Sequence, residues 1–269
     1  MNKNPASPIG IFDSGIGGLT VAHAITQLLP HESIIYFGDT AHLPYGDKSE
    51  AAIQAYSIKI ADVLLQKGCK LIVIACNSAS SAAYELLKEY VNNQVHLINV
   101  IDPMVAWVAT HLAGKKVGLI GTRRTVQSNI YTKKIDEKNA GIQLCSLATP
   151  LLAPMIEEGY FNNRISHDLI EEYLKNIVFN DIRALILACT HYPLIKEEIE
   201  NFYTRTTPVL DSSEMVAQAV QNYLSVNQLL NNASPHHSFL VSDYTHSFEM
   251  ATQLFFRQKV NLEKYPLWN

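Results

Sequence analysis

Two cysteines that stand in closely similar surroundings are the residues of this chain best suited to do chemistry. Cys76 ends the segment Lys70-Leu-Ile-Val-Ile-Ala-Cys76, and Cys189 ends the segment Arg183-Ala-Leu-Ile-Leu-Ala-Cys189. Each segment is a basic residue, an apolar run, an alanine and the cysteine, and the two cysteines are 113 positions apart (189 minus 76). One reactive thiol indicates a nucleophile, whereas a matched pair indicates a more symmetric reaction.

Both thiols are expected at the carboxyl end of a buried strand, where a helix begins. A short apolar run between polar residues is typical of a buried parallel strand, and open α/β sheets bind ligands just beyond the carboxyl ends of such strands. Asn77 or Ser78 can cap a helix after Cys76, and Pro193 favours a helix start after Cys189. The positive field of a helix start predicts a thiol pKa below its usual value of about 8.5.

A structural role is the alternative for every cysteine, because a free cysteine is often a small, inert and buried residue. Duplication and the expected helix starts favour a functional role for Cys76 and Cys189. Cys69 and Cys145 lack that context, and we interpret them as structural.

A second repeat supports internal duplication. The segment 9–15 (IGIFDSG) resembles the segment 117–123 (VGLIGTR), and each runs from a strand into a turn with a hydroxyl residue. Asp13, at the first strand end, could orient or deprotonate a neighbouring thiol or amine. The turns Asp13–Gly18 and Gly121–Thr125 could cradle an anion with backbone amides, although a tight turn alone explains the glycines. The first turn lacks the spacing of a dinucleotide fingerprint and the lysine of a Walker loop.

The alternation of strand-like and helical segments predicts an α/β fold with mainly parallel sheets flanked by helices. The segments between the expected strands have apolar residues at helical spacing, and one of them predicts a helix over Val126–Lys138. The two repeats predict two related halves, divided near Asn99–Pro103 and again near Pro208–Ser212. The expected strands are Ile9–Phe12, Ser33–Phe37, Leu71–Ala75, Val95–Val100, Val117–Ile120, Ile142–Ser146, Ala184–Ala188 and Phe239–Ser242.

Composition excludes several classes of function. The 269 residues carry a formal net charge of −4 and no basic stripe, so neither nucleic acid nor a membrane surface is an expected partner. The long uncharged stretches contain prolines or many polar residues, and none is expected to span a membrane. Four cysteines without a secretory signal pattern favour reduced thiols and a cytoplasmic location.

Metal binding is not expected, although Cys189 and His191 are close in sequence. No second closely spaced pair completes a tetrahedral set of ligands. Cys–His nucleophilic catalysis is possible, with His191 or His42 as the base, but it leaves the second cysteine unexplained.

Five motifs occur in order along the chain: segments 11–18 (IFDSGIGG), 38–46 (GDTAHLPYG), 75–78 (ACNS), 121–125 (GTRRT) and 188–193 (ACTHYP). Together they resemble the glutamate racemase family, within the aspartate/glutamate racemase superfamily, and the resemblance runs from Pro8 to about Phe256. The motif around the second cysteine matches the family well. At the first cysteine the family usually has Cys-Asn-Thr, whereas this chain has Cys-Asn-Ser, with Ser78 in place of the threonine. The serine keeps the hydroxyl and loses one methyl group.

The resemblance implies an isomerase that interconverts L- and D-glutamate without a cofactor and supplies D-glutamate for peptidoglycan synthesis. It also implies two similar α/β domains with the active site between them, residues 1–99 plus 212–269 forming the first and residues 100–211 the second, and a homodimer. By family analogy, Cys76 takes the α-proton from D-glutamate and Cys189 takes it from L-glutamate.

The other site residues follow from the same resemblance. Asp13 would assist Cys76, and His191 would assist Cys189 together with Glu157, whose role the adjacent Glu158 could fill instead. The residues that match substrate-contact motifs are Asp13, Ser14, Tyr45, Gly46, Asn77, Ser78, Thr122, Thr125, Thr190 and His191.

Two further interpretations compete with a glutamate racemase. A racemase of the same superfamily could act on aspartate or a hydantoin. A non-catalytic α/β module could instead bind a small anion through its two turns, and it would have unreactive, buried cysteines.

Overall fold

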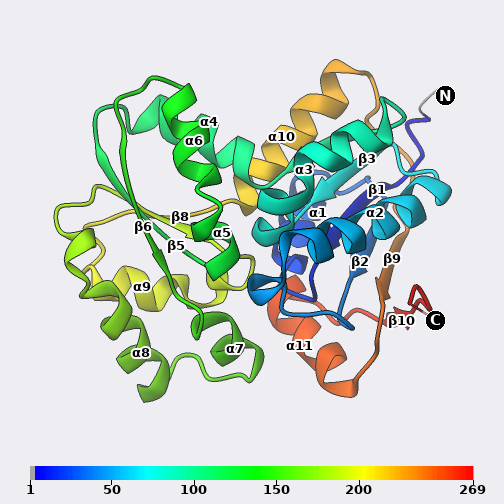
Figure 1. The fold of residues 1–269 in the computed structure, drawn as a ribbon. Helices are drawn as coiled ribbons and strands as arrows, with labels where there is room; N and C mark the ends of the chain where they lie inside the picture. The colour runs from blue at the N-terminus through cyan, green and yellow to red at the C-terminus, as the bar shows by residue number, and fades with distance from the viewer. Residues whose placement is uncertain (1–3, 269) are drawn as a thin grey trace.

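A computed structural model describes residues 4–268 and contains two β-sheets, each flanked by helices (Figure 1). All pairings in both sheets are parallel. This arrangement confirms the predicted fold class. The strands are β1 (Ile9–Asp13), β2 (Ile34–Gly38), β3 (Leu71–Ile74), β4 (His96–Asn99), β5 (Lys116–Gly121), β6 (Gln143–Ala148), β7 (Leu185–Ala188), β8 (Val209–Asp211), β9 (His237–Val241) and β10 (Leu262–Lys264).

Helices connect the strands and cover the sheets. The α-helices are α1 (Leu19–Leu28), α2 (Glu50–Gln66), α3 (Asn77–Val91), α4 (Ile101–His111), α5 (Arg123–Gln127), α6 (Ile130–Glu137), α7 (Leu152–Glu157), α8 (Arg164–Leu174), α9 (Lys196–Phe202), α10 (Ser213–Val226) and α11 (His246–Phe256). Three short 3-10 helices are η1 (Tyr45–Asp47), η2 (Ile177–Phe179) and η3 (Tyr192–Ile195).

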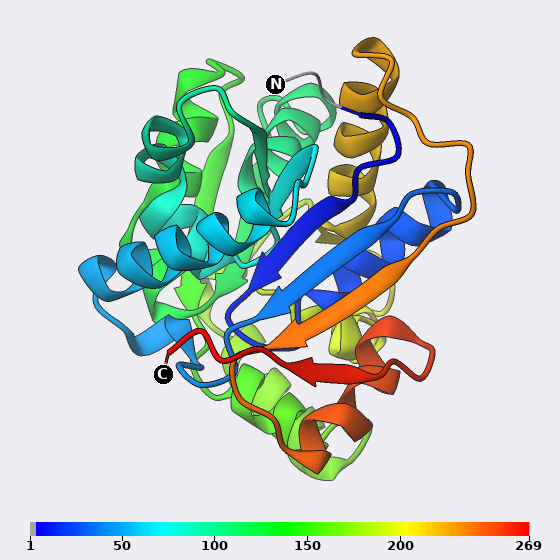
Figure 2. The same cartoon turned by 90° about the vertical axis from the view of Figure 1, so that its right-hand side faces the viewer.

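The two sheets share one strand order, as an internal duplication predicts. The first sheet runs β10-β9-β2-β1-β3-β4, and the second runs β6-β5-β7-β8. Strands β2-β1-β3-β4 therefore correspond to β6-β5-β7-β8, while β9 and β10 extend the first sheet beside β2 (Figure 2). In this correspondence β3 is equivalent to β7, so Cys76 and Cys189 follow equivalent strands.

Buried apolar runs explain why these segments are strands. Every residue of β1, β3 and β7 is buried, as expected for central parallel strands that have helices on both faces. Each fully buried aliphatic side chain contributes about 1.5–3 kcal/mol relative to leaving it exposed.

Residues at the strand ends also start the helices that follow. Cys76 is itself the N-cap of α3, because its Sγ accepts a bond from the backbone N–H of Ala79 at 3.4 Å. In the other domain, Thr122 caps α5 by accepting a bond from the N–H of Thr125 at 3.2 Å. Helices α3 and α5 therefore begin at the ends of β3 and β5, and both of these strand ends carry candidate site residues.

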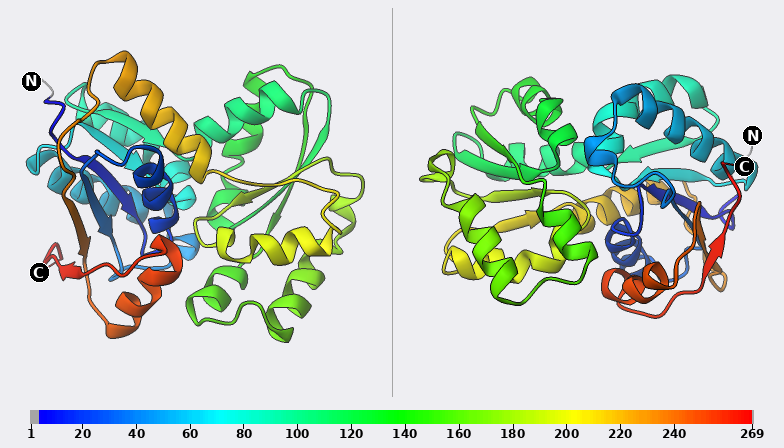
Figure 3. Two further views of the ribbon diagram at one scale, coloured as in Figure 1. Left: turned by 180° about the vertical axis from the view of Figure 1, so that it is seen from behind. Right: turned by 60° about the horizontal axis from the view of Figure 1, so that its bottom comes forward.

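The chain passes between the sheets twice. Helix α4 leads from β4 to β5, and α10 leads from β8 back to β9. Figure 3 shows α10 beside the two domains, where it packs against α1 and α4. The predicted boundaries at 99/100 and 211/212 lie beside these helices, and they stay predictions.

One predicted helix is wrong in its extent. Instead of a single helix over Val126–Lys138, the structure has α5 and α6 separated at Asn129, whose φ of 54° is left-handed. A residue in this conformation ends the regular helix because its backbone cannot continue the right-handed path. Within residues 4–268, no helix is both long and apolar enough to cross a membrane.

Candidate active site

A small cavity of about 30 Å³ lies between the two domains and receives both candidate thiols. Cys76 comes from the first domain and Cys189 from the second, so the structure brings together the two cysteines that the sequence singles out. The other residues around the cavity are Ser14, Pro44, Tyr45, Gly46, Asn77, Ser78, Thr122, Ala153, Glu157, Thr190 and His191.

Most predicted site residues therefore line one cavity, and two lie just behind it. Asp13 is fully buried beneath Ser14 at the end of β1, and Thr125 supports Thr122 through the bond that caps α5. Sequence reasoning did not select Pro44 or Ala153, which carry no chemical signal because their side chains are apolar.

Cys76 is buried against polar groups of its own domain. Its Sγ is 3.7 Å from the Ser14 hydroxyl oxygen, to which it can donate, and it accepts the N–H of Ala79. Burial raises the pKa of the Cys76 thiol to about 12, and the negative charge of Asp13 adds to the rise. The bonds from Ala79 and with Ser14 act in the opposite direction but are outweighed. The expectation that the helix start lowers this pKa is therefore wrong, because the loss of solvent has the larger effect.

Asp13 has one carboxylate oxygen held by the backbone and one free to face a reacting group. Oδ2 accepts the N–H groups of Gly15 and Gly18 at 3.2 and 3.0 Å. Oδ1 is buried and has no hydrogen-bond partner among the described residues. A buried oxygen without a partner is costly, which is typical of a position that a proton or an ammonium group occupies during function.

The glycine-rich turn serves close packing as well as backbone geometry. A Cβ at Gly17 would lie 2.6 Å from the ring of His191, and one at Gly18 would lie 2.6 Å from the Cβ of Asp13. Because two of the turn's N–H groups bind Asp13, the turn is less available as an anion cradle than the sequence suggested. Gly17 lets the first domain approach His191 of the second, and Gly18 leaves room for Asp13.

Cys189 has a different set of neighbours. Its Sγ is 3.7 Å from Nδ1 of His191, and Nε2 of His191 is 2.9 Å from a carboxylate oxygen of Glu157. The His191–Glu157 approach is an ion-pair contact whose angles depart from those of a good hydrogen bond. Phe255 of α11 packs its ring edge-on against His191 with the centroids 5.4 Å apart. Glu157, the last residue of α7, is thus the carboxylate that faces His191, whereas Glu158 is exposed.

The charge state of His191 is set by opposing effects. Burial disfavours the imidazolium, but the contacts with Cys189 and Glu157 outweigh burial and raise the His191 pKa well above its usual value. A protonated His191 places a positive charge next to any negative charge that forms on Cys189. The two thiols therefore have unlike surroundings within a symmetric frame.

Polar contacts across the cavity join the domains. The hydroxyls of Ser78 and Thr122 are 2.9 Å apart, and the Tyr131 hydroxyl donates to the Asn77 side-chain oxygen at 2.8 Å. Sequence reasoning missed Tyr131, because nothing in a helical segment signals a partner on another domain. These bonds fix three of the side chains that face the cavity, those of Asn77, Ser78 and Thr122.

The arginines of the turn Gly121–Thr125 do not face the cavity. Arg123 pairs with Asp47 at 2.9 Å, with both side chains exposed, and Arg124 donates to the carbonyl oxygen of Lys48 at 2.9 Å. They connect the second domain to η1 of the first. This turn therefore offers its threonines, rather than its arginines, to a ligand.

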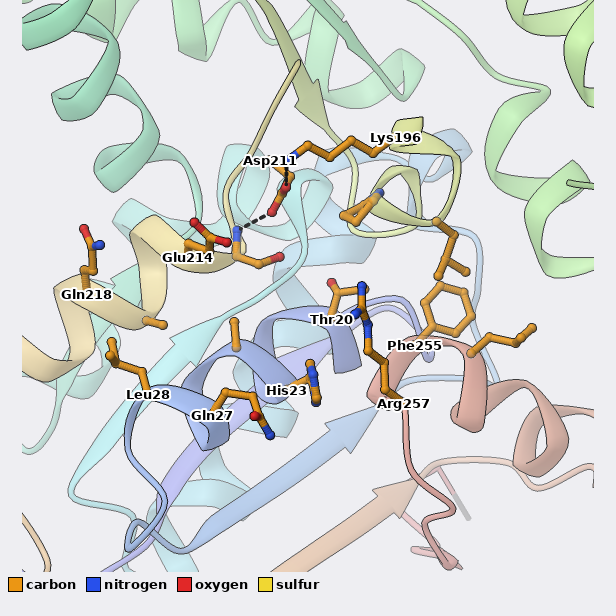
Figure 4. A pocket seen from close by; sticks show the side chains of 16 residues that line it. Thr20, His23, Gln27, Leu28, Lys196, Asp211, Glu214, Gln218, Phe255 and Arg257 are labelled. Carbon is orange, nitrogen blue, oxygen red and sulfur yellow. Dashed lines mark hydrogen bonds and ion pairs between the residues drawn. The ribbon is translucent and has the colours of Figure 1, made fainter. Parts of the chain in front are cut away.

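A larger cavity of about 570 Å³ lies behind the site, between α1, α10 and α11 (Figure 4). Lys196 and Asp211 form an ion pair of 2.8 Å at its edge, and neither candidate cysteine lines it. Among the described residues, no group of three or more His, Cys, Asp or Glu side chains is arranged to hold a metal ion.

Comparison with known proteins identifies the family. A model of the Asp/Glu/Hydantoin racemase family matches residues 18–220. This chain belongs to the Asp/Glu/Hydantoin racemase family. A glutamate racemase of Chlorobaculum parvum is 38% identical over 253 residues, with 93% of this chain and 92% of the relative covered. One of Geobacter metallireducens is 39% identical over 246 residues, covering 91% and 90%.

A solved racemase structure of the same family has nearly the same fold. The glutamate racemase of Francisella tularensis, crystallised in complex with D-glutamate, superposes with a TM-score of 0.92 at 37% identity. The match covers 98% of this chain and 99% of that one. Both domains and their relative placement are therefore common to the two proteins.

Proposed function

We propose that this protein interconverts L- and D-glutamate without a cofactor, by two-base proton transfer between Cys76 and Cys189, and that it supplies D-glutamate for peptidoglycan synthesis. The observation that carries the proposal is the cavity itself, because it receives one thiol from each domain at equivalent strand ends. The similarity to several glutamate racemases supports glutamate as the substrate.

Inversion at an α-carbon explains why two thiols are useful. The α-proton must leave from one face of the carbon and a proton must arrive on the other face. Two fixed acid/base groups on opposite sides do this without moving the substrate, one acting as thiolate and the other as thiol. Neither group is consumed, and no electron leaves the substrate.

The surroundings of each thiol suit its part in this reaction. Cys76 holds its proton at neutral pH because its pKa is about 12, so it is ready to protonate the carbanion formed from L-glutamate. Cys189 is then the base, with His191 and Glu157 beside it. In the reverse direction Cys76 removes the proton from D-glutamate, assisted by Asp13, whose charge acts on the Cys76 thiol and whose buried Oδ1 has no hydrogen-bond partner among the described residues.

Neutral polar groups are sufficient to hold the substrate. The hydroxyls of Ser14, Ser78 and Thr122 and the amide of Asn77 border the cavity, and with Thr190 they can bind carboxylates and an ammonium group without a metal ion.

The proposal is tested by chiral analysis of the purified protein incubated with L-glutamate and no added cofactor. We expect D-glutamate to accumulate until the two enantiomers are equal, and in heavy water we expect deuterium at the α-carbon of the product. Failure to form D-glutamate would overturn the proposal.

The remaining alternative is a related substrate, since the family also includes aspartate and hydantoin racemases by its description. Parallel assays with L-aspartate and a hydantoin separate the possibilities. We expect turnover of glutamate to exceed turnover of either by a large factor, and equal or faster turnover of another substrate would reassign the enzyme.

A further inference from the structure

Asp39, a fully buried carboxylate outside the cavity, gathers hydrogen-bond donors from separate segments of the first domain. Oδ2 accepts the hydroxyl of Tyr45 at 2.6 Å, and Oδ1 accepts the hydroxyl of Ser242 and the indole N–H of Trp268, each at 2.7 Å. Nδ1 of His42 lies 3.1 Å from Oδ2. The donors come from the loop after β2, from η1, from the end of β9 and from the segment after β10.

The number of donors matches what a buried carboxylate needs. Removing a carboxylate from water is costly unless its oxygens accept hydrogen bonds, and two carboxylate oxygens offer about four acceptor sites. Among the described residues, His42 is the group in direct contact with the Asp39 carboxylate that can carry positive charge, and its side chain is partly exposed. The hydroxyl and indole donors therefore stabilise the charge, and loss of any one leaves a buried acceptor site unfilled.

Trp268 is held in this cluster by its ring as well as by its N–H. Its ring contacts the rings of His42 and Tyr56 edge-on, with centroids 4.5 and 5.3 Å apart. The ammonium group of Lys59 lies 4.9 Å from the centre of the indole. His42 and Tyr56 stack with centroids 4.0 Å apart, so the segment after β10 is packed against α2 and the loop that carries Asp39.

The same carboxylate fixes a turn that lines the candidate active site. Tyr45 is 1% exposed and borders the cavity, but its hydroxyl is committed to Asp39 and is therefore not the group that it offers to a substrate. Next to it, Gly46 lies so close to Thr122 that a Cβ would be 2.9 Å from the Thr122 Cβ. Asp47 then pairs with Arg123. The turn η1 is thus held by Asp39 on one side and contacts the second domain on the other.

We propose that Asp39 and Trp268 form a positioning unit that holds η1 in the geometry needed to bind the substrate. This inference rests on the proposed racemase function. Neither residue contacts the reacting atoms, so their loss weakens substrate binding while the two-thiol chemistry continues. A change that removes binding equally from ground and transition states raises KM and leaves kcat nearly constant.

The test compares Trp268→Phe, which keeps an aromatic ring but removes the indole N–H, with Asp39→Asn and with the double variant. Because a bond to a charged group is strong, we expect Trp268→Phe to raise KM for both enantiomers about threefold to tenfold, with kcat changed by less than about twofold. Asp39→Asn should raise KM further. The double variant should resemble Asp39→Asn alone, because both changes act through one carboxylate.

Trp107 provides a matched control and a second readout. It is the chain's other tryptophan, lies on α4 and stacks on His111, so Trp107→Phe should leave KM and kcat unchanged. In that background Trp268 is the sole tryptophan, and Asp39→Asn should shift its fluorescence emission to longer wavelength as the indole is released into water. This spectral change requires no substrate.

The possible results separate this inference from the proposed function. If the wild-type protein does not racemise glutamate, the proposed function fails and the positioning role fails with it. If the wild-type protein is active but Trp268→Phe and Asp39→Asn both leave KM unchanged, only the positioning role is overturned. A fall in kcat at constant KM, additive effects in the double variant or an unshifted Trp268 emission would also overturn it.

Discussion

At the scale of single residues, the two thiols differ in what surrounds them although they follow equivalent strands. Cys76 faces Ser14 and the charge of Asp13, while Cys189 faces His191, which in turn contacts Glu157. A chiral substrate presents different groups to the two domains, so unlike neighbours in a symmetric frame are expected. His191 is the residue through which this asymmetry can be measured.

Glu157→Gln tests whether Glu157 sets the charge of His191. Contacts with Cys189 and Glu157 raise the His191 pKa despite burial, so the imidazolium persists above its usual range and is lost as pH rises through the raised pKa. Without the Glu157 charge this pKa falls, and we expect the decline of kcat on the alkaline side to move to lower pH. The pH dependence of kcat in both directions checks this.

The neighbouring residue supplies the control for that experiment. Glu158 is exposed, and Glu158→Gln should leave the pH profile where it is. The sequence alone left the two glutamates open, because adjacent positions on a helix end can be distinguished only once the packing is known. An equal shift in both variants, or a shift in Glu158→Gln alone, would reject the assignment of Glu157.

At the scale of elements, the start of α1 depends on the absence of a side chain at Gly18. A Cβ there would lie 2.6 Å from the Cβ of Asp13, whereas a Cβ at Gly15 would meet Leu43 at an ordinary 3.5 Å. Overpacking of this kind costs about 1–3 kcal/mol. We therefore expect Gly18→Ala to lower the free energy of unfolding by about that amount and to reduce kcat by displacing Asp13. Urea unfolding and steady-state kinetics measure both effects.

Gly15→Ala is the matched variant within the same turn. It should lower the free energy of unfolding much less than Gly18→Ala, because the added methyl group meets no atom closer than normal contact. Similar decreases in the free energy of unfolding of the two variants would show that the close approach to the Asp13 Cβ is not the cause of the loss of stability in Gly18→Ala.

The sequence predicted the central strands well because they are continuous apolar runs buried on both faces, as in β3 and β7. The short strand β8 and the edge strand β10 were not predicted, since three residues carry too little pattern. Helix α4 was missed as well, because Pro103 was interpreted as a boundary whereas a proline is compatible with the first turn of a helix.

The sequence predicts the site residues whose type alone indicates the chemistry. It does not predict the contacts that depend on where the fold places a residue. Paired cysteines, an aspartate at a strand end and a histidine two residues after a thiol are visible in the sequence. The bond from Tyr131 to Asn77 depends on how two domains meet. The bond from Trp268 to Asp39 joins positions that are 229 residues apart, so the sequence does not signal it.

At the scale of the whole molecule, the homodimer expected from the family resemblance stays a prediction. Sedimentation equilibrium should give a mass about twice the 30.0 kDa of one chain. A mass of one chain at all concentrations up to those used in the activity assay would contradict it. The result matters for the cavity, because a partner could narrow access to a site that lies between domains.

The two-thiol mechanism involves the whole molecule, because it requires one thiol from each domain to act on opposite faces of one carbon. It predicts that Cys76→Ala and Cys189→Ala each lower racemisation by about 10²- to 10⁴-fold, the usual contribution of a positioned acid or base. Cys145→Ala removes a half-buried thiol outside the cavity and should leave racemisation intact.

The most direct measurement is the exchange of the α-hydrogen of each enantiomer in heavy water, catalysed by Cys76→Ala and by Cys189→Ala. The products are examined by chiral separation and mass spectrometry. Cys189→Ala retains Cys76 as its one catalytic thiol and should incorporate deuterium into D-glutamate but not L-glutamate. Cys76→Ala should show the reverse preference. Neither variant should invert the substrate at an appreciable rate. Exchange of both enantiomers by one variant, or racemisation by either at the wild-type rate, would contradict the two-thiol mechanism.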